Sequence, residues 1–359
     1  MRRPLATAAL LVLLAACVAP AQEPALPPEL REKLGAMRGI TAEQAQELEE
    51  KLKTKPDDRE AREKLIRYYF LARLDSGTPA AAENREKHIL WLIEHHPQSD
   101  LAGSPEASIE PWGNAGSTEG YQRGKQLWLQ HAQNHPGNAQ ILCNAAQYLQ
   151  FGDSKISREL LEKAVAVAPG DWQASSLLAQ SYLLARIQAR SPEERKALAQ
   201  KAFAIRERAL GYAEGELRFY AINDAAKEAF EAGETAKAAQ YASELLESAP
   251  RNKGNWAYGN AIFTGNSVLG RIALQRGDVS AAKQYLLATG ETPGSPQLDT
   301  FGPDMTLAQE LLDKGEREAV INFLQSCGKF WMMGKEELQS WISTIRAGGK
   351  PDFSRNLSR

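Results

Sequence analysis

Residues 160–169 read Leu-Leu-Glu-Lys-Ala-Val-Ala-Val-Ala-Pro, and this stretch decides the fold. Its apolar side chains recur at helical spacing, and the final proline ends the helix because it cannot continue the backbone hydrogen bonds. A second helical pattern begins after Gly170 and Asp171, with Leu178 and Tyr182 on one face. Residues 160–182 therefore predict two amphipathic helices joined by a short polar turn.

The same arrangement recurs along the chain and indicates a repeat. Pro136 and Pro169, which both close predicted helices, lie 33 residues apart (169 − 136). An interval close to 34 residues is typical of a helix–turn–helix repeat. Each such pair has an apolar stripe too wide to cover by itself, so stacking on the next pair buries it. The closing prolines are Pro56, Pro97, Pro136, Pro169 and Pro250.

These motifs resemble the tetratricopeptide repeat family, from about Thr41 to Ile345. Leu178-Ala179 with Tyr182 matches the L-[GA]-x-x-Y core of the family's first repeat helix, and Ala164 stands where the family has a small residue. The resemblance implies an all-α solenoid of stacked antiparallel helix pairs, with about five to seven repeats. Further matches are Leu65-Ile66 with Tyr69, Leu269-Gly270 with Ala273, Gly277-Asp278 with Ala282, and Leu307-Ala308 with Leu311.

Insertions make the repeat intervals irregular. We expect an N-terminal block over 41–212 and a C-terminal block over 213–346, the latter ending in a capping helix. Within it, helices over 216–232 and 234–248 turn at Gly233. Residues 347–359 are expected to form a loose tail. The insertions are expected at 75–82, 98–116, 187–192 and 251–263.

Residues 1–21 have the order of a secretory signal peptide. Arg2 and Arg3 precede an apolar run over 5–16, which is too short to span a bilayer. The Ala19-Pro20-Ala21 stretch fits an A-x-A cleavage site and would release a protein without an anchor.

A second processing route remains open. Leu14-Ala15-Ala16-Cys17 resembles the lipobox of bacterial lipoproteins, in which the cysteine is lipidated. The Pro/Ala-rich residues 22–40 would then act as a tether, because Pro-rich segments are extended. Both routes predict export to the periplasm. Membrane attachment is expected only through a lipid on Cys17.

Composition narrows the function. The chain of 359 residues is 43% hydrophobic and 25% charged, as in ordinary folded proteins. Its formal net charge of −2 gives no strong field of one sign, so nucleic acid is not an expected partner. Cys143 and Cys327 stand far apart in apolar helical contexts, which favours small buried hydrophobic residues over a disulfide.

No motif indicates catalysis, and we expect no cofactor. The five histidines fall between His88 and His135, and His131 and His135 have an i, i+4 spacing compatible with a metal site. No H-E-x-x-H accompanies them, so we favour surface or helix-end histidines. The segment over 113–117 fits neither a G-x-S-x-G nor a P-loop motif.

Two insertions carry aromatic residues suited to ligand contact. Trp112 lies in the first, where packing over a helix edge is the simpler interpretation. The second contains Trp256, Tyr258 and Asn260, which suit a binding surface and equally suit a plug between repeat blocks.

The repeat phase places neutral amides on the expected concave face. Such groups pair well with the donors and acceptors of an extended peptide backbone. The lysine, asparagine and arginine set with which some family members clamp a terminal carboxylate is missing. The sequence predicts a non-catalytic scaffold that binds a protein or peptide in the cell envelope; a metal-dependent or a glycan- or peptidoglycan-binding protein is the alternative. The amides are Gln140, Asn144, Gln147, Gln173 and Gln180.

Overall fold

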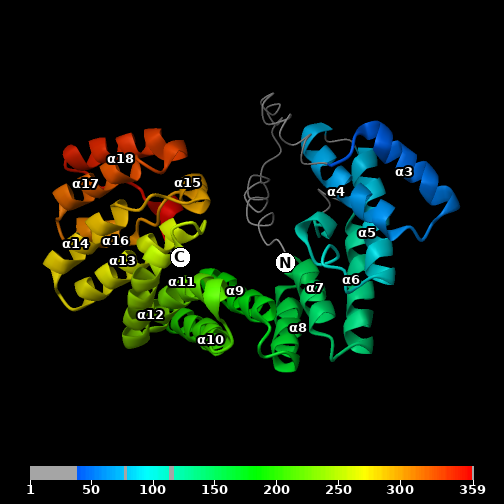
Figure 1. Ribbon diagram of the computed structural model, residues 1–359, viewed down its shortest axis with the longest axis horizontal. Helices are drawn as coiled ribbons and strands as arrows, with labels where there is room; N and C mark the ends of the chain where they lie inside the picture. Colours follow the sequence, from blue (N-terminus) through cyan, green and yellow to red (C-terminus); the bar gives the residue numbers. More distant parts are fainter. Residues whose placement is uncertain (1–38, 77–78, 113–116, 358–359) are drawn as a thin grey trace. The chain divides into compact units, whose positions relative to one another are not determined.

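A computed structural model describes residues 39–76, 79–112 and 117–357. These residues form 16 α-helices and contain no strand, and helices that follow one another in the chain pack together (Figure 1). The expected all-α helical-repeat fold is confirmed. The signal peptide, the lipobox with Cys17 and residues 22–38 of the tether lie outside the described residues.

The chain divides into two compact units, residues 1–168 and 169–359. This boundary differs from the expected one at 212–213, because the two helices that follow residue 168 pack with those after them. The first unit contains α3 (Ala42–Thr54), α4 (Arg59–Ser76), α5 (Pro79–His95), η2 (Pro105–Ala107), α6 (Thr118–Asn134), α7 (Ala139–Leu149) and α8 (Ser154–Val167).

The second unit continues the pairing of helices. It opens with α9 (Trp172–Gln188), α10 (Pro192–Leu210), α11 (Gly215–Ala232), α12 (Thr235–Ser248) and η3 (Ala249–Asn252). It continues with α13 (Tyr258–Gln275), α14 (Val279–Gly290), α15 (Pro296–Phe301), α16 (Thr306–Asp313), α17 (Arg317–Cys327), η4 (Met332–Gly334), α18 (Lys335–Arg346) and η5 (Ser354–Asn356).

Local sequence signals set the helix ends. The side chains of Asp171 and Asp278 accept hydrogen bonds from backbone N–H groups in the first turns of α9 and α14. Gly233 follows α11 with φ of 84°, and Gly277 precedes α14 with φ of 80°. Glycine adopts this left-handed conformation without the strain that a Cβ causes. The turn predicted at Gly233 is thereby confirmed.

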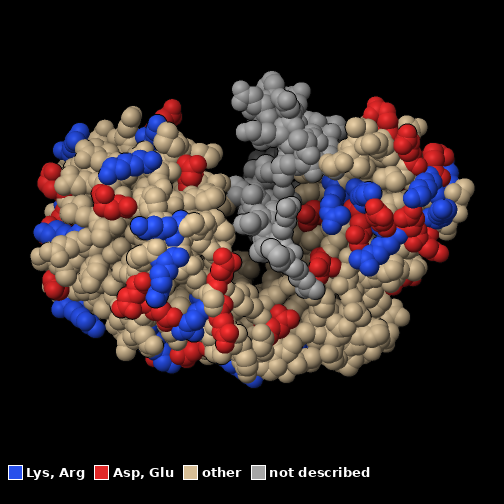
Figure 2. Space-filling view, in the orientation of Figure 1, with Lys and Arg blue, Asp and Glu red and all other residues tan. Residues whose placement is uncertain are grey.

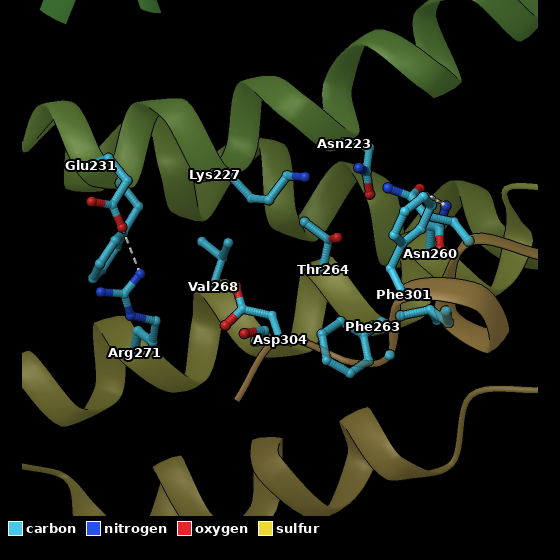
Figure 3. A pocket seen from close by; sticks show the side chains of 15 residues that line it. Asn223, Lys227, Glu231, Asn260, Phe263, Thr264, Val268, Arg271, Phe301 and Asp304 are labelled. Carbon is cyan, nitrogen blue, oxygen red and sulfur yellow. Dashed lines mark hydrogen bonds and ion pairs between the residues drawn. The ribbon is translucent and has the colours of Figure 1, made fainter. Parts of the chain in front are cut away.

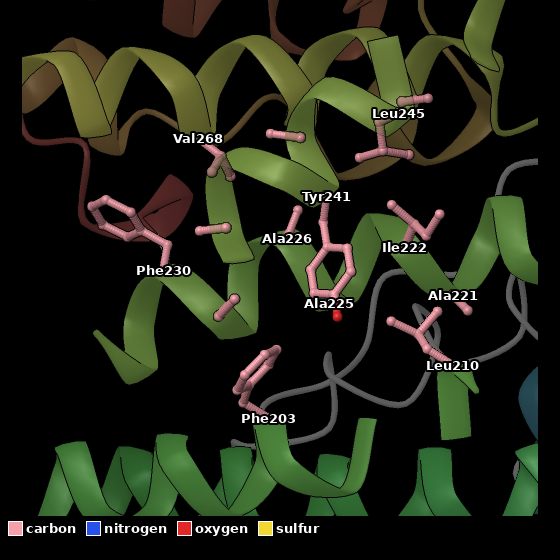
Figure 4. Packing of buried hydrophobic residues seen from close by; sticks show 14 of the residues in the cluster. Phe203, Leu210, Ala221, Ile222, Ala225, Ala226, Phe230, Tyr241, Leu245 and Val268 are labelled. Carbon is pink, nitrogen blue, oxygen red and sulfur yellow. The ribbon is translucent and has the colours of Figure 1, made fainter. Parts of the chain in front are cut away.

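Small residues allow the helices of the second unit to approach closely. Ala225, Ala226 and Ala229 of α11 are fully buried, and Phe203 and Tyr241 fill the space beside them (Figure 4). One close approach lies at Gly270 of α13, where a Cβ would come within 2.5 Å of a methyl carbon of Leu307. The matched small residues of the repeat pattern therefore serve packing, as expected.

The C-terminal segment is not a loose tail. Phe353 is 1% exposed and packs edge-on against Trp341, with ring centroids 4.9 Å apart. The Asn356 amide donates to the carbonyl of Phe301 at 3.0 Å, and the Asn356 carbonyl accepts from the N–H of Met305 at 2.7 Å. Burial of the Phe353 ring and these two hydrogen bonds hold residues 350–357 against the unit, which sequence periodicity could not reveal.

Helices also extend into the expected insertions. α4 continues to Ser76 and α5 begins at Pro79, while α13 begins at Tyr258. Tyr258 and Asn260 are therefore helical residues and not part of a loop.

Both cysteines of the described part are buried and free, as predicted. Burial raises the pKa of the Cys327 thiol, which keeps it protonated and unreactive. None of the helices described is both long enough and apolar enough to span a bilayer.

Candidate functional site

A pocket of about 180 Å³ opens in the second unit between α11, α13 and α15. In Figure 3, Asn223, Lys227 and Glu231 descend from α11 along one line, because they are spaced by about one helical turn. Thr264, Val268 and Arg271 face them from α13. The site is therefore built by the matching faces of α11 and α13, each the first helix of its pair.

One end of the pocket is rich in amide groups. The Asn260 amide donates to Gln297 Oε1 at 2.9 Å, and the Ser295 hydroxyl donates to Asn260 Oδ1 at 2.6 Å. Asn223 Oδ1 is buried and has no hydrogen-bond donor in the part of the chain that the structure describes. A buried acceptor without a donor is costly, so a ligand that supplies an N–H or O–H would be favoured here.

The pocket also has apolar walls. Phe263, Val268 and Leu298 are each less than a tenth exposed, whereas Phe301 is 50% exposed at the rim. The C-terminal segment positions this rim, because Asn356 binds the Phe301 carbonyl. A small apolar group could enter while its polar neighbours bind the amide end.

A row of alternating charges crosses four helices at the other end. Glu231 of α11 accepts from Arg186 of α9 at 3.0 Å and from Arg271 of α13 at 2.7 Å. Arg271 also binds Glu310 of α16 at 3.0 Å. Burial, with the nearby carboxylates Glu231 and Asp304, raises the pKa of Glu310 although Arg271 opposes this shift.

An open groove of about 740 Å³ adjoins the pocket. Pocket and groove share the lining residues Phe230, Glu231 and Arg271, so they adjoin at this wall. Arg195 and Lys196 of α10 line the groove and are exposed. Elsewhere the two signs of charge are intermixed on the face that Figure 2 shows, as the small net charge predicts.

An aromatic pair lies near the start of α11 and α13. Trp256, 40% exposed, stacks on Tyr220 with ring centroids 5.5 Å apart. The Asn255 amide donates to the Tyr220 hydroxyl at 2.7 Å and fixes the pair. Tyr220 precedes Asn223 by one turn on α11, so the same helix carries aromatic, amide and charged groups in order.

The predicted groove amides fall in different places. Gln140, Asn144 and Gln147 belong to α7 of the first unit, whereas Gln173 and Gln180 are exposed on α9 of the second. Asn144 is 1% exposed, so it is not available to a partner, which corrects its expected position on an open face. The reason is the segment between α5 and η2, whose carbonyls of Pro97 and Ser99 accept from the Asn144 amide at 2.9 and 3.0 Å.

The predicted ligand-contact residues are also separated. Trp112 is 56% exposed, donates to Glu110 Oε2 at 3.1 Å and contacts Phe151 edge-on. Tyr258 is half-buried, and Asn260 lines the pocket. The sequence analysis missed Asn223, Lys227 and Glu231. Their spacing of four residues, which places three polar side chains on one face of a helix, could have indicated this site.

The histidines do not gather at one point. His131 and His135 lie on and just after α6 with ring centroids 6.3 Å apart. No group of three or more His, Cys, Asp or Glu side chains is placed to hold a metal ion among the residues described. Burial lowers the pKa of His131, which favours its neutral form.

His88 was expected at the surface or at a helix end, but it is completely buried. Its Nδ1 atom lies 3.1 Å from Arg62 Nη1, and its Nε2 atom lies 2.9 Å from Glu49 Oε1. Because the guanidinium can only donate, Nδ1 accepts and Nε2 carries the proton given to Glu49. Both ring nitrogens are thus used within the core, and His88 joins α3, α4 and α5.

This network predicts a loss of stability in acid. Burial alone would raise the pKa of Glu49, but hydrogen bonds from His88 and Tyr69 lower it overall. A lowered carboxyl pKa stabilises the folded state above the unfolded-state value of about 4.3, and the stabilisation disappears as pH falls through the folded-state value. The melting-temperature difference between the wild type and Glu49→Gln should therefore shrink from pH 6 to pH 3.

Circular dichroism at several pH values measures this difference. Glu47→Gln, an exposed change on the same helix, serves as the control and should show a small difference throughout. A gap for Glu49→Gln that stays constant down to pH 3 would contradict the expectation.

No model of a known protein family matches the chain, and no curated protein does so at a significant level. The resemblance to tetratricopeptide repeats therefore stays a prediction.

Proposed function

We propose that the protein is an exported, non-catalytic repeat scaffold, and that α9, α11 and α13 of its second unit bind an extended polypeptide segment. The observation that carries this proposal is the pocket between α11, α13 and α15, with its apolar walls and the unpaired Asn223 Oδ1. An extended peptide supplies both a side chain for the walls and a backbone N–H for the acceptor.

The sequence supports the remaining parts of this proposal. The signal-peptide pattern over 1–21 favours action in the cell envelope, with or without a lipid on Cys17. The tetratricopeptide resemblance favours protein binding, because stacked helix pairs expose the first helices of successive pairs on one face. The aromatic pair Tyr220 and Trp256 extends this surface beyond the pocket with rigid contact area.

A pocket-filling variant tests the proposal. Ser267 lines the pocket, and Ser267→Trp should occupy it with an indole. Peptides selected from a random display library against the wild-type protein should bind it saturably and bind Ser267→Trp at least about tenfold more weakly, a loss of about 1.4 kcal/mol. Fluorescence anisotropy measures both affinities.

Ser280→Trp provides the matched control, because Ser280 is exposed on α14 and does not line the pocket. It should retain wild-type affinity, and both variants should keep the wild-type melting temperature. Failure to select any saturable peptide, or equal losses in the two variants, would refute the proposal. Saturable binding of peptidoglycan fragments that depends on Trp256 would instead favour the glycan alternative.

A further inference from the structure

We infer that the bound polypeptide segment is acidic as well as apolar: one apolar side chain enters the pocket, and acidic side chains beside it lie over Arg195 and Lys196. This inference rests on the proposed function and specifies the partner's chemistry. It follows from the charge of the groove, from the exposure of two of its cations, and from the wall that groove and pocket share.

The groove has a clear excess of positive charge. Four cationic side chains and one carboxylate line it, which gives a local formal charge of +3 (4 − 1) in a chain whose total is −2. Positive charge gathered in a concave surface attracts anionic groups and orients them. The cations are Arg186, Arg195, Lys196 and Arg271, and the carboxylate is Glu231.

Two of these cations are engaged within the protein and two are available. Arg186 and Arg271 both bind Glu231, so they position one another and the carboxylate. Arg195 and Lys196 are exposed, and no carboxylate of the described residues lies within ion-pair distance of either. They stand near the beginning of α10, directly after Glu193 and Glu194 of its first turn, which do not line the groove.

The carboxylates of the protein also indicate on which side of the apolar side chain the acidic side chains of the bound peptide lie. Beyond Arg271 the surface carries the carboxylates Asp304 and Glu310, and burial, with a smaller contribution from Glu231 and Asp304, raises the pKa of Glu310. Another carboxylate on that side would be repelled. The acidic side chains therefore extend from the pocket toward α10, past the shared residues Phe230 and Glu231.

Three fluorescein-labelled peptides test the inference. Each has about a dozen residues, one central phenylalanine and an amidated C-terminus, and its flanking residues are all glutamate, all glutamine or all lysine. The amide removes the terminal carboxylate, so only side-chain charge can act. The acidic peptide should bind at least about tenfold more tightly than the neutral one at low salt, and added salt should reduce this ratio because it screens exposed charges.

The double variant Arg195→Glu, Lys196→Glu should abolish the preference for the acidic peptide. A second double variant, Arg195→Gln, Lys196→Gln, removes the charges without reversing them and should reduce the preference to near unity. Lys335→Glu, Arg346→Glu on α18 changes the net charge equally at exposed positions outside the groove, and it should retain the preference.

Equal binding of acidic and neutral peptides, or equal losses in the groove and control variants, would overturn the inference. Binding of library-selected peptides that shows no dependence on acidic residues would overturn it and leave the proposed function standing. Absence of saturable binding by any peptide would overturn both.

Discussion

Glu228→Gln is expected to lower the free energy of unfolding of the second unit by about 3–5 kcal/mol, the usual cost of removing one partner of a buried ion pair. Glu228 of α11 and Arg206 of α10 are each about 5% or less exposed at their side chains. The guanidinium donates to both carboxylate oxygens of Glu228, at distances of 2.9 to 3.3 Å. With an amide in place of the carboxylate, a buried positive charge would lose its counter-charge.

The surroundings of Arg206 offer little compensation. Its guanidinium lies over the ring of Trp172, 5.0 Å from the ring centroid, and donates to the Ser176 hydroxyl at 3.1 Å. Asp224 is 3.9 Å away and half exposed, so its attraction is screened by water. Urea denaturation followed by circular dichroism measures the loss.

The double variant Arg206→Met, Glu228→Leu shows whether the ion pair itself stabilises the fold. If it does not, the loss in Glu228→Gln comes from the buried Arg206 charge that is left without a partner. The double variant removes both charges and keeps comparable volume, so it should recover most of the stability lost in Glu228→Gln. Glu234→Gln, a change at the exposed residue before α12, is the single-site control. A Glu228→Gln loss below about 1 kcal/mol would contradict the buried-pair interpretation.

Arg85→Met is expected to release the segment 97–112 from the first unit and to lower the free energy of unfolding by about 3 kcal/mol, because charged hydrogen bonds are lost and buried carbonyls lose a donor. Arg85 of α5 is 1% exposed. Its guanidinium donates to the carbonyls of Glu106 and Ser108, both at 2.8 Å, and stands over the ring of Phe70. Methionine preserves the apolar stem but cannot donate.

Limited proteolysis and thermal denaturation together check this expectation. Arg85→Met should be cleaved within 97–112 much faster than the wild type, at a temperature where both remain folded. Arg123→Met changes an exposed arginine on α6 and should leave the cleavage rate unchanged. Equal protection of the segment in Arg85→Met and wild type would show that Asn144 and the apolar contacts suffice to hold it.

Local patterns predicted the helices and turns well. The spacing of Leu178 and Tyr182 placed both on the buried face of α9, and Gly233 and Gly277 marked turns that require positive φ. These features depend on a few neighbouring residues, so a single sequence contains the information that sets them. Gly270 of α13, part of a match to the repeat pattern, likewise stands at a close helix approach.

The site and the polar core could not be predicted in the same way. His88 joins Glu49 and Arg62 from two other helices, and Asn144 is covered by a segment far from it in sequence. The C-terminal segment packs because the ring of Phe353 contacts that of Trp341. Asn223 lines a pocket only because α11 lies opposite Thr264 of α13. Each of these contacts depends on how segments that are distant in sequence pack against one another.

By itself, then, the sequence determined that helices form, where some of them end or turn, and that they must stack to bury their apolar stripes. Only the tertiary structure decided which polar side chains became buried partners and which remained around the pocket and groove. The physical reason is that helix periodicity and capping act over a few residues, whereas burial of a polar group depends on contacts between segments that lie up to about fifty residues apart.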